Sequence, residues 1–247
     1  MNLTKHIFHL AVSTVVLQIV LVACTKESDV AVMTMNMQMT GTAKIWMFGS
    51  GTVTIDWGDG TASETHTLWA YENSNFQNHK SCYYHDYSGP SIHVIKVTGK
   101  NITYLDCSWS GVTSLDVRKN TKLEILDCSW SGVTSLDVSK NTKLTYLYCS
   151  THTLTDLDVS KNTALMYLDC KYSQLMRLDV SRNTALYWLN CQYNQLSTSA
   201  LNDLFRTLHD KSISSGKRIA IYGNPGTDAC DVNITNDKGW IVWKEKL

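Results

Sequence analysis

Cysteine is the most reactive residue type in this sequence, and five of its eight cysteines recur at a constant interval. These five are Cys107, Cys128, Cys149, Cys170 and Cys191. Thiols could bind a metal ion, but metal ligands must converge on one point, whereas a constant repeat sets equivalent side chains in a parallel row. Free cysteine also packs well as a small apolar residue. We therefore predict a column of packed thiols, no metal ion and no cofactor, and we predict no disulfide between Cys82 and Cys230, which lie outside the repeat.

Aromatic and acidic residues recur with the same interval beside these cysteines. Three residues before each cysteine stand Tyr104, Ile125, Tyr146, Tyr167 and Trp188. One residue before it stand Asp106, Asp127, Tyr148, Asp169 and Asn190, and two residues after it stand Trp109, Trp130, Thr151, Tyr172 and Tyr193. All except Ile125 and Thr151 are candidate ligand-binding residues, because rows of solvent-facing aromatic rings are typical of binding surfaces. The alternative is that the rings stack across neighbouring strands and stabilise a sheet, and both can hold together.

The repeat that positions these residues is the motif Leu-x-x-Leu-x-Cys, which recurs every 21 residues within residues 100–196. A fixed period of this length indicates a solenoid whose coils share one core. The motif resembles the leucine-rich repeat family, in the internalin-like form found on bacterial surface lipoproteins. The resemblance implies about five coils, with a parallel β-sheet on the concave side that would carry the aromatic and acidic residues. The family's usual asparagine is mostly absent, since its column reads Ser110, Ser131, His152, Ser173 and Asn194.

Two further polar columns look like rows of catalytic groups. They are Asp116, Asp137, Asp158 and Asp179, and Asn120, Asn141, Asn162 and Asn183. In every coil they adjoin an Asn-Thr turn, so we interpret them as side chains that bond to the backbone. The sequence contains no His-Glu-x-x-His, Gly-x-Ser-x-Gly or Walker motif, and its eight histidines form no constellation. We predict that the protein is not an enzyme.

Residues 32–99 alternate between apolar and polar side chains, as half-buried strands do. One alternation begins at Met33, and another runs from Val53 to Trp57 and ends in the turn Gly58-Asp59-Gly60. This WGDG motif resembles the PKD family of immunoglobulin-like domains, which implies a small β-sandwich that serves as a spacer or adhesive module. Some members bind calcium, but we interpret Asp56, Asp59 and Asp86 as turn residues, because no EF-hand spacing is present.

The first residues have the pattern of an export signal. Lys5 and His6 precede an apolar run, as in a secretory signal peptide covering residues 1–23. The run ends in Leu-Val-Ala-Cys, which resembles the lipobox of bacterial lipoproteins and implies lipidation of Cys24. Because Thr25 follows, the resemblance implies sorting to the outer membrane, and residues 24–31 would be a polar tether. An ordinary secretory cut and an uncleaved membrane helix are the alternatives.

After Asn194 the period breaks. Leu201, Leu204, Phe205 and Leu208 lie on one face of a predicted helix, and strands are predicted near residues 218–222 and 240–243, with a short helix between them. Terminal units of a solenoid shield its open end. We therefore predict that residues 197–247 form an α/β C-terminal cap.

The formal net charge is zero, so no attraction to nucleic acid is predicted, and membrane contact would come only from the lipid. The predicted fold is mainly β: a short solenoid with an N-terminal β-sandwich and a C-terminal cap. We predict a cell-surface or outer-membrane adhesion module that captures a protein or peptide with basic character on the aromatic–acidic concave face. A glycan-binding module and a structural spacer without its own ligand are the alternatives.

Overall fold

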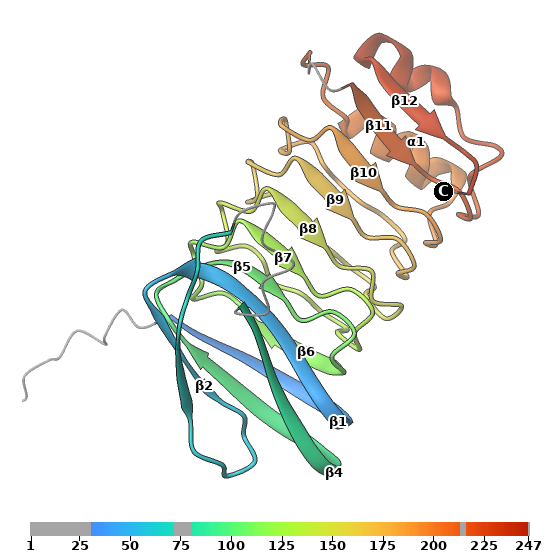
Figure 1. Ribbon diagram of the computed structural model, residues 1–247. Helices are drawn as coiled ribbons and strands as arrows, with labels where there is room; N and C mark the ends of the chain where they lie inside the picture. The colour runs from blue at the N-terminus through green and yellow to red at the C-terminus, as the bar shows by residue number, and fades with distance from the viewer. Residues whose placement is uncertain (1–30, 72–80, 213–215, 247) are drawn as a thin grey trace, which may run out of the picture.

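The computed structural model describes residues 31–71, 81–212 and 216–246 (Figure 1). The predicted signal peptide, the lipidation site Cys24 and nearly all of the tether lie outside these residues. All strands of the described part belong to one 12-stranded sheet in the order β12-β11-β10-β9-β8-β7-β5-β1-β4-β2-β3, with β6 paired to β1. Within the same residues, no helix combines the length and apolar character needed to cross a membrane.

The repeats form a ladder of short parallel strands. Leu105 pairs with Leu126, and Leu126 pairs with Leu147, so neighbouring strands are offset by one repeat. The ladder continues beyond the repeats through β11 (Lys217–Ala220) and β12 (Trp240–Trp243). The prediction of a mainly β fold with a parallel sheet is confirmed. The strands of the repeats are β5 (Asn101–Asp106), β7 (Ile125–Asp127), β8 (Tyr146–Tyr148), β9 (Tyr167–Asp169) and β10 (Trp188–Asn190).

The leucine and cysteine columns fill the interior of the solenoid. All five repeated cysteines are fully buried, and every cysteine of the described residues is a free thiol. The Sγ of Cys107 lies 3.6 Å from the carbonyl oxygen of Asp127 on the next strand, and Cys128, Cys170 and Cys191 make the equivalent contact. Burial raises the pKa of these thiols, because a thiolate would have no water around it.

The asparagine column forms a second ladder within the turns. The Nδ2 of Asn141 donates to the carbonyl oxygens of Val117 and Asn120 in the preceding coil, at 3.0 and 2.9 Å. Asn162 and Asn183 repeat this pair of bonds one and two coils later. The aspartates of the neighbouring column each accept the backbone N–H two residues on. The interpretation as side chains that bond to the backbone is therefore confirmed for the four aspartates and for Asn141, Asn162 and Asn183, whereas the buried side chain of Asn120 has no partner among the described residues.

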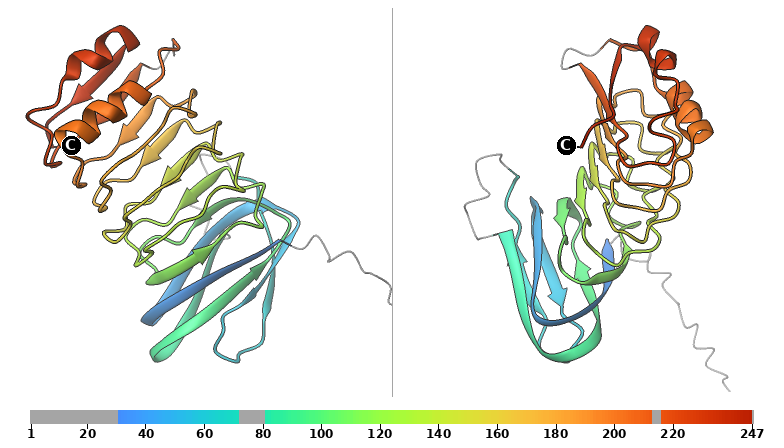
Figure 2. Two further views of the ribbon diagram at one scale, coloured as in Figure 1. Left: turned by 180° about the vertical axis from the view of Figure 1, so that it is seen from behind. Right: turned by 90° about the vertical axis from the view of Figure 1, so that its right-hand side faces the viewer.

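The N-terminal strands extend the repeat sheet. They are β1 (Val32–Ser50), β2 (Thr52–Asp56), β3 (Glu64–Thr67) and β4 (Cys82–Thr98). β1 pairs antiparallel with β4 from Val32 to Trp46. On its other edge it pairs with β6 (Val112–Asp116) near its start and with β5 over its last residues. The long β1–β4 pair therefore covers the first coil on two sides, as Figure 2 shows from behind and from the side. The assignment of residues 32–99 to a PKD-like sandwich stays a prediction.

The turn after β2 explains the glycine of the WGDG motif. Gly58 has φ +76°, and a Cβ there would lie 2.4 Å from the carbonyl oxygen of Val94, so only glycine fits. Asp56 and Asp59 accept backbone N–H groups of the same turn. Asp59 also lies 2.6 Å from Nε2 of His85, and bonds from Thr61 and His85 hold the pKa of its carboxyl well below the usual range.

The C-terminal segment adds one helix and a short 3-10 helix. Helix α1 (Thr198–Thr207) begins after Ser197, whose side chain accepts the N–H of Ala200, and it buries Leu201, Leu204 and Phe205. The 3-10 helix η3 (Val232–Lys238) ends at Gly239, which has φ +68°. Lys238 Nζ donates to three carbonyl oxygens at the end of α1, and this joins the two helices.

Candidate ligand-binding face

The first aromatic row lies on the outer side of the parallel sheet. We call it the sheet-face track: Tyr104, Ile125, Tyr146, Tyr167 and Trp188, which stand at equivalent positions of β5, β7, β8, β9 and β10. All except Tyr104 are partly exposed. The ring of Tyr167 lies 5.9 Å from Tyr146 and 5.9 Å from Trp188, with interplanar angles of 29° and 11°. The predicted stacking across strands is therefore present.

Residues from outside the repeats extend this track at both ends. Tyr71, which follows β3, stacks on Tyr104 with ring centroids 5.0 Å apart and an interplanar angle of 15°. At the other end, Trp243 of β12 meets Trp188 edge to face at 5.4 Å, and the guanidinium of Arg218 lies 5.6 Å from the Trp243 ring centroid. Sequence reasoning missed all three residues, because none of them belongs to the repeat.

The acid track consists of Asp106, Asp127, Tyr148, Asp169 and Asn190, one residue further along each strand. The aspartates and the final asparagine of this track bond to the turn that follows each strand. The Oδ1 of each accepts the backbone N–H of the residue two positions later. Burial, with a smaller effect from the Asp106 charge, raises the pKa of Asp127 to about 6. The four bonds are Ser108 N–H to Asp106, Ser129 N–H to Asp127, Lys171 N–H to Asp169, and Gln192 N–H to Asn190.

Three of the residues predicted to face solvent are buried. Tyr104 is 6 % exposed because Tyr71 and Phe48 cover its ring. Asp169 is 7 % exposed, and Lys171 lies over it with Nζ 3.3 Å from its Oδ2. Asn190 is 4 % exposed, at the C-terminal end of the same track. The open part of the acid track is thus its N-terminal half.

The second aromatic row follows the strands instead of lying on them. We call it the edge track: Trp109, Trp130, His152, Tyr172 and Tyr193, all with φ between 52° and 59°. This left-handed conformation costs an ordinary residue about 1 to 2 kcal/mol, and ring stacking offsets it. Trp109 and Trp130 stack at 4.7 Å, and Tyr172 and Tyr193 stack at 4.4 Å.

One position of the edge track was assigned to the wrong residue. The sequence places Thr151 in this column, but Thr151 is buried, and the left-handed residue of that coil is His152, one position later. The His152 ring lies 5.0 Å from Trp130 and 5.7 Å from Tyr172, so it closes the gap in the row. The available signal was the aromatic ring of His152 in a column whose other members are three serines and an asparagine. The row ends on Tyr222, which meets Tyr193 edge to face at 5.3 Å.

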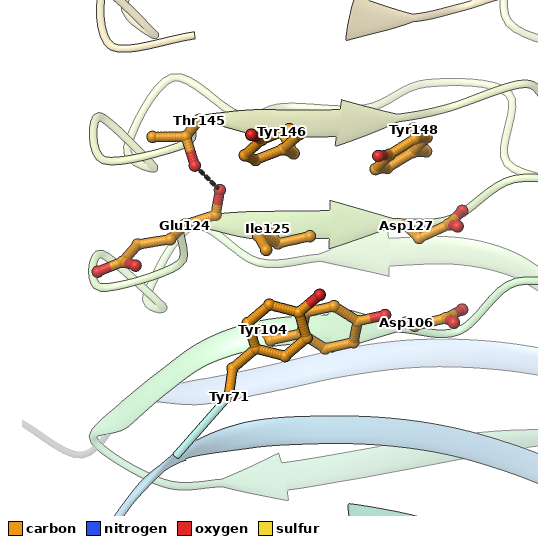
Figure 3. Close-up of a pocket in the computed structure, with 9 residues that line it drawn as sticks. All are labelled: Tyr71, Tyr104, Asp106, Glu124, Ile125, Asp127, Thr145, Tyr146 and Tyr148. Carbon is orange, nitrogen blue, oxygen red and sulfur yellow. Dashed lines mark hydrogen bonds between the residues drawn. The ribbon is translucent and has the colours of Figure 1, made fainter. Parts of the chain in front are cut away.

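A cleft of about 720 Å³ lies where the N-terminal strands meet the sheet face. Its walls come from both parts, with Tyr71 and Tyr104 on one side and Tyr146 and Tyr148 on the other (Figure 3). Asp106 and Asp127 lie one above the other at one end of it, and Glu124 lies at the other end. The lining therefore joins four tyrosines with three carboxylates, and none of the described residues that line it is basic.

The remaining candidate sites of the described residues show no metal chemistry. No group of three or more His, Cys, Asp or Glu side chains in this part of the chain could hold a metal ion. Asp86, the third candidate calcium ligand, is bonded by the Thr42 hydroxyl.

No protein-family model matches the sequence, and no curated protein matches it. Two solved structures from Listeria monocytogenes are similar to it. One is the functional domain of InlJ, described as including a cysteine ladder, with 31% identity, a TM-score of 0.47, and coverage of 57% of this chain and 29% of that one. The other is the internalin InlF, with 18% identity, a TM-score of 0.34, and coverage of 57% of this chain and 46% of that one. This chain therefore spans less than half the length of each of these two proteins.

Proposed function

We propose that this protein is a binding module, without catalytic activity, whose sheet face captures a protein or peptide partner. The observation that carries the proposal is the partly exposed run of rings from Tyr146 through Tyr167 and Trp188 to Trp243, together with the cleft at its N-terminal end, where Asp106 and Asp127 have no ion-pair partner among the described residues. A partner that covers these rings gains apolar contact at small entropic cost, because neighbouring rings already hold them in place.

The arrangement of the rings favours a polypeptide over a glycan. Sugar rings stack on open aromatic faces, but the faces of Tyr167 are turned toward Tyr146 and Trp188. The row therefore exposes ring edges and polar ring atoms to a partner, and these can contact backbone and side-chain groups of a protein. Burial disfavours the charged form of Asp127. A spacer that binds no ligand would have no use for a carboxylate at such a position.

The location that we propose is the bacterial cell surface or outer membrane, reached by export and lipidation of Cys24. This proposal rests on residues 1–24 of the sequence alone. Inhibition of processing by globomycin tests the lipid on Cys24. Protease treatment of intact cells tests surface exposure, since only a surface-exposed chain is digested.

The binding proposal is tested by probing the purified chain against immobilised peptide and glycan arrays. We expect peptide capture, and we expect the double variant Tyr146→Ala and Trp188→Ala to lose it, because buried aromatic anchors contribute roughly 2 kcal/mol or more each. Met176→Ala is the matched control, since Met176 is a 72 % exposed apolar residue outside all three tracks. Capture of glycans alone would replace the proposal, and peptide capture that survives the double variant would remove it from the sheet face.

A further inference from the structure

The cleft at the N-terminal end of the sheet face carries carboxylates that have no ion-pair partner among the described residues. Asp106 and Asp127 are register partners on β5 and β7, and neighbouring strands lie about 4.8 Å apart. Each accepts a 2.9 Å turn bond at Oδ1, from the N–H of Ser108 and Ser129 respectively, and Asp127 also accepts a bond from the Ser129 side chain. A carboxylate has about four acceptor positions, so both can accept further donors from a ligand. Neither takes part in any ion pair of the described residues.

In the same acid track, Asp169 is an acid that does have a counter-charge from the protein. Asp169, two strands further on, has Lys171 at 3.3 Å and is closed off from solvent. The position two residues after Asp106 and Asp127 holds serine instead of lysine, so no cation of the protein reaches the cleft from there. Two adjacent carboxylates in partly desolvated surroundings are unfavourable without a counter-charge. A cation from a partner would supply it.

The rings around the two carboxylates indicate which kind of cation fits. Tyr148 stands beyond Asp127, while the stacked pair of Tyr71 and Tyr104 stands beside Asp106 (Figure 3). A guanidinium is planar, presents five N–H donors and is weakly hydrated, so it bridges carboxylates and packs on aromatic rings. An ammonium group is a compact, strongly hydrated charge that gains less from such walls.

We infer that this cleft is a subsite for an arginine side chain of the partner, with the guanidinium held between Asp106 and Asp127 and packed among the tyrosines. The inference rests on the proposed function and deepens it, because it names the group that the partner must present. It also places the specificity at one end of the sheet face and leaves the rest of the aromatic row for apolar contact.

The test uses N-acetyl-arginine amide as the probe, with N-acetyl-citrulline amide as its neutral isostere and N-acetyl-lysine amide as the alternative cation. Backbone amide NMR shifts report the binding, since Ser108 and Ser129 donate to the two carboxylates. We expect saturable shifts of both amides with a dissociation constant on the order of millimolar. We expect citrulline to bind at least about tenfold more weakly, because it lacks the charge.

Variants separate the subsite from general damage to the fold. Asp127→Asn should weaken the arginine probe at least about tenfold, yet it can keep its turn bond, as Asn190 does at the equivalent position. Asp137→Asn is the matched control, because Asp137 belongs to the same repeat and makes the same bond to Ser139 away from the cleft. Equal binding of citrulline, equal or tighter binding of lysine, or an unaffected Asp127→Asn variant would overturn the inference.

The two proposals fail in different ways. If arrayed peptides are captured on the sheet face regardless of whether they contain arginine, the binding function stands and the arginine subsite is wrong. If the arginine probe shifts Ser108 and Ser129 but no peptide is captured, the subsite stands and the proposed function is wrong.

Discussion

Removal of the Asp127 charge should make the protein more stable at neutral pH. The folded protein raises the pKa of this carboxyl from 3.8 to about 6, chiefly by burial. Asp127→Asn removes the charge and retains an oxygen that can accept the Ser129 N–H. A raised pKa means that the wild-type protein is stabilised below pH 4 and loses that contribution as the pH rises to 6, whereas the variant does not.

The expected size follows from the shift. About two pKa units correspond to roughly 3 kcal/mol at 1.36 kcal/mol per unit, and partial exposure of the side chain reduces this to roughly 1 to 2 kcal/mol. Urea unfolding of wild type and Asp127→Asn at pH 4, 5, 6 and 7.5 measures the difference. We expect it to be near zero at pH 4, to grow between pH 4 and 6, and to level off above pH 6.

Asp137→Asn provides the opposite sign in the same repeat. Bonds from Ser139 lower the pKa of Asp137, so its contribution to stability is present above the ordinary pKa and is lost on acidification. That variant should be less stable than wild type at pH 7.5, and the difference should shrink at low pH. If Asp127→Asn were instead less stable than wild type at every pH, its carboxylate would be a structural group and the reasoning from burial would fail.

Three further outcomes are expected. Asn141→Ala should lower the free energy of unfolding by roughly 2 to 4 kcal/mol in urea titrations, because it removes two bonds to the carbonyls of the preceding coil; an effect below 1 kcal/mol would contradict a stabilising ladder. Lys238→Met should lower it by roughly 1 to 2 kcal/mol and speed hydrogen exchange in α1, since three carbonyls lose their donor; unchanged exchange would argue against that role. The thiol of Cys149 should react with a thiol reagent only after unfolding, whereas the half-buried Cys82 should react in the folded protein; equal rates would show that the column is open.

The sequence predicted the repeat region well because its signal is repeated and local. One leucine column, one cysteine column and one asparagine column each occupy the same environment coil after coil, so every repeat supports the same interpretation. The buried face of α1 was predicted for the same reason, since Leu201, Leu204 and Phe205 follow helical spacing and are buried. Patterns of this kind depend on residues that lie close together in the chain.

The features that the sequence did not predict depend on distant residues. Gly41 has the character of a strand end, but β1 continues past it with a register shift and pairs with three other strands. Tyr104 is buried because Tyr71, 33 positions earlier, stacks on it. In one coil the residue with left-handed backbone conformation is His152 instead of Thr151. This difference belongs to the backbone of that coil alone, so a comparison of equivalent positions across the repeats does not reveal it.

The first residues of β1 are hydrogen-bonded on both edges of the strand, and this affects how the molecule transmits a pulling force. They are held by β4 on one edge and β6 on the other, directly after residue 31. A pull transmitted along the polypeptide from the preceding residues therefore meets a strand whose backbone bonds on both edges resist together, and it passes into the sheet that carries the sheet-face track. Under the proposed function, an anchor that precedes residue 31 and a partner on the sheet face would therefore be connected by one continuous hydrogen-bonded sheet.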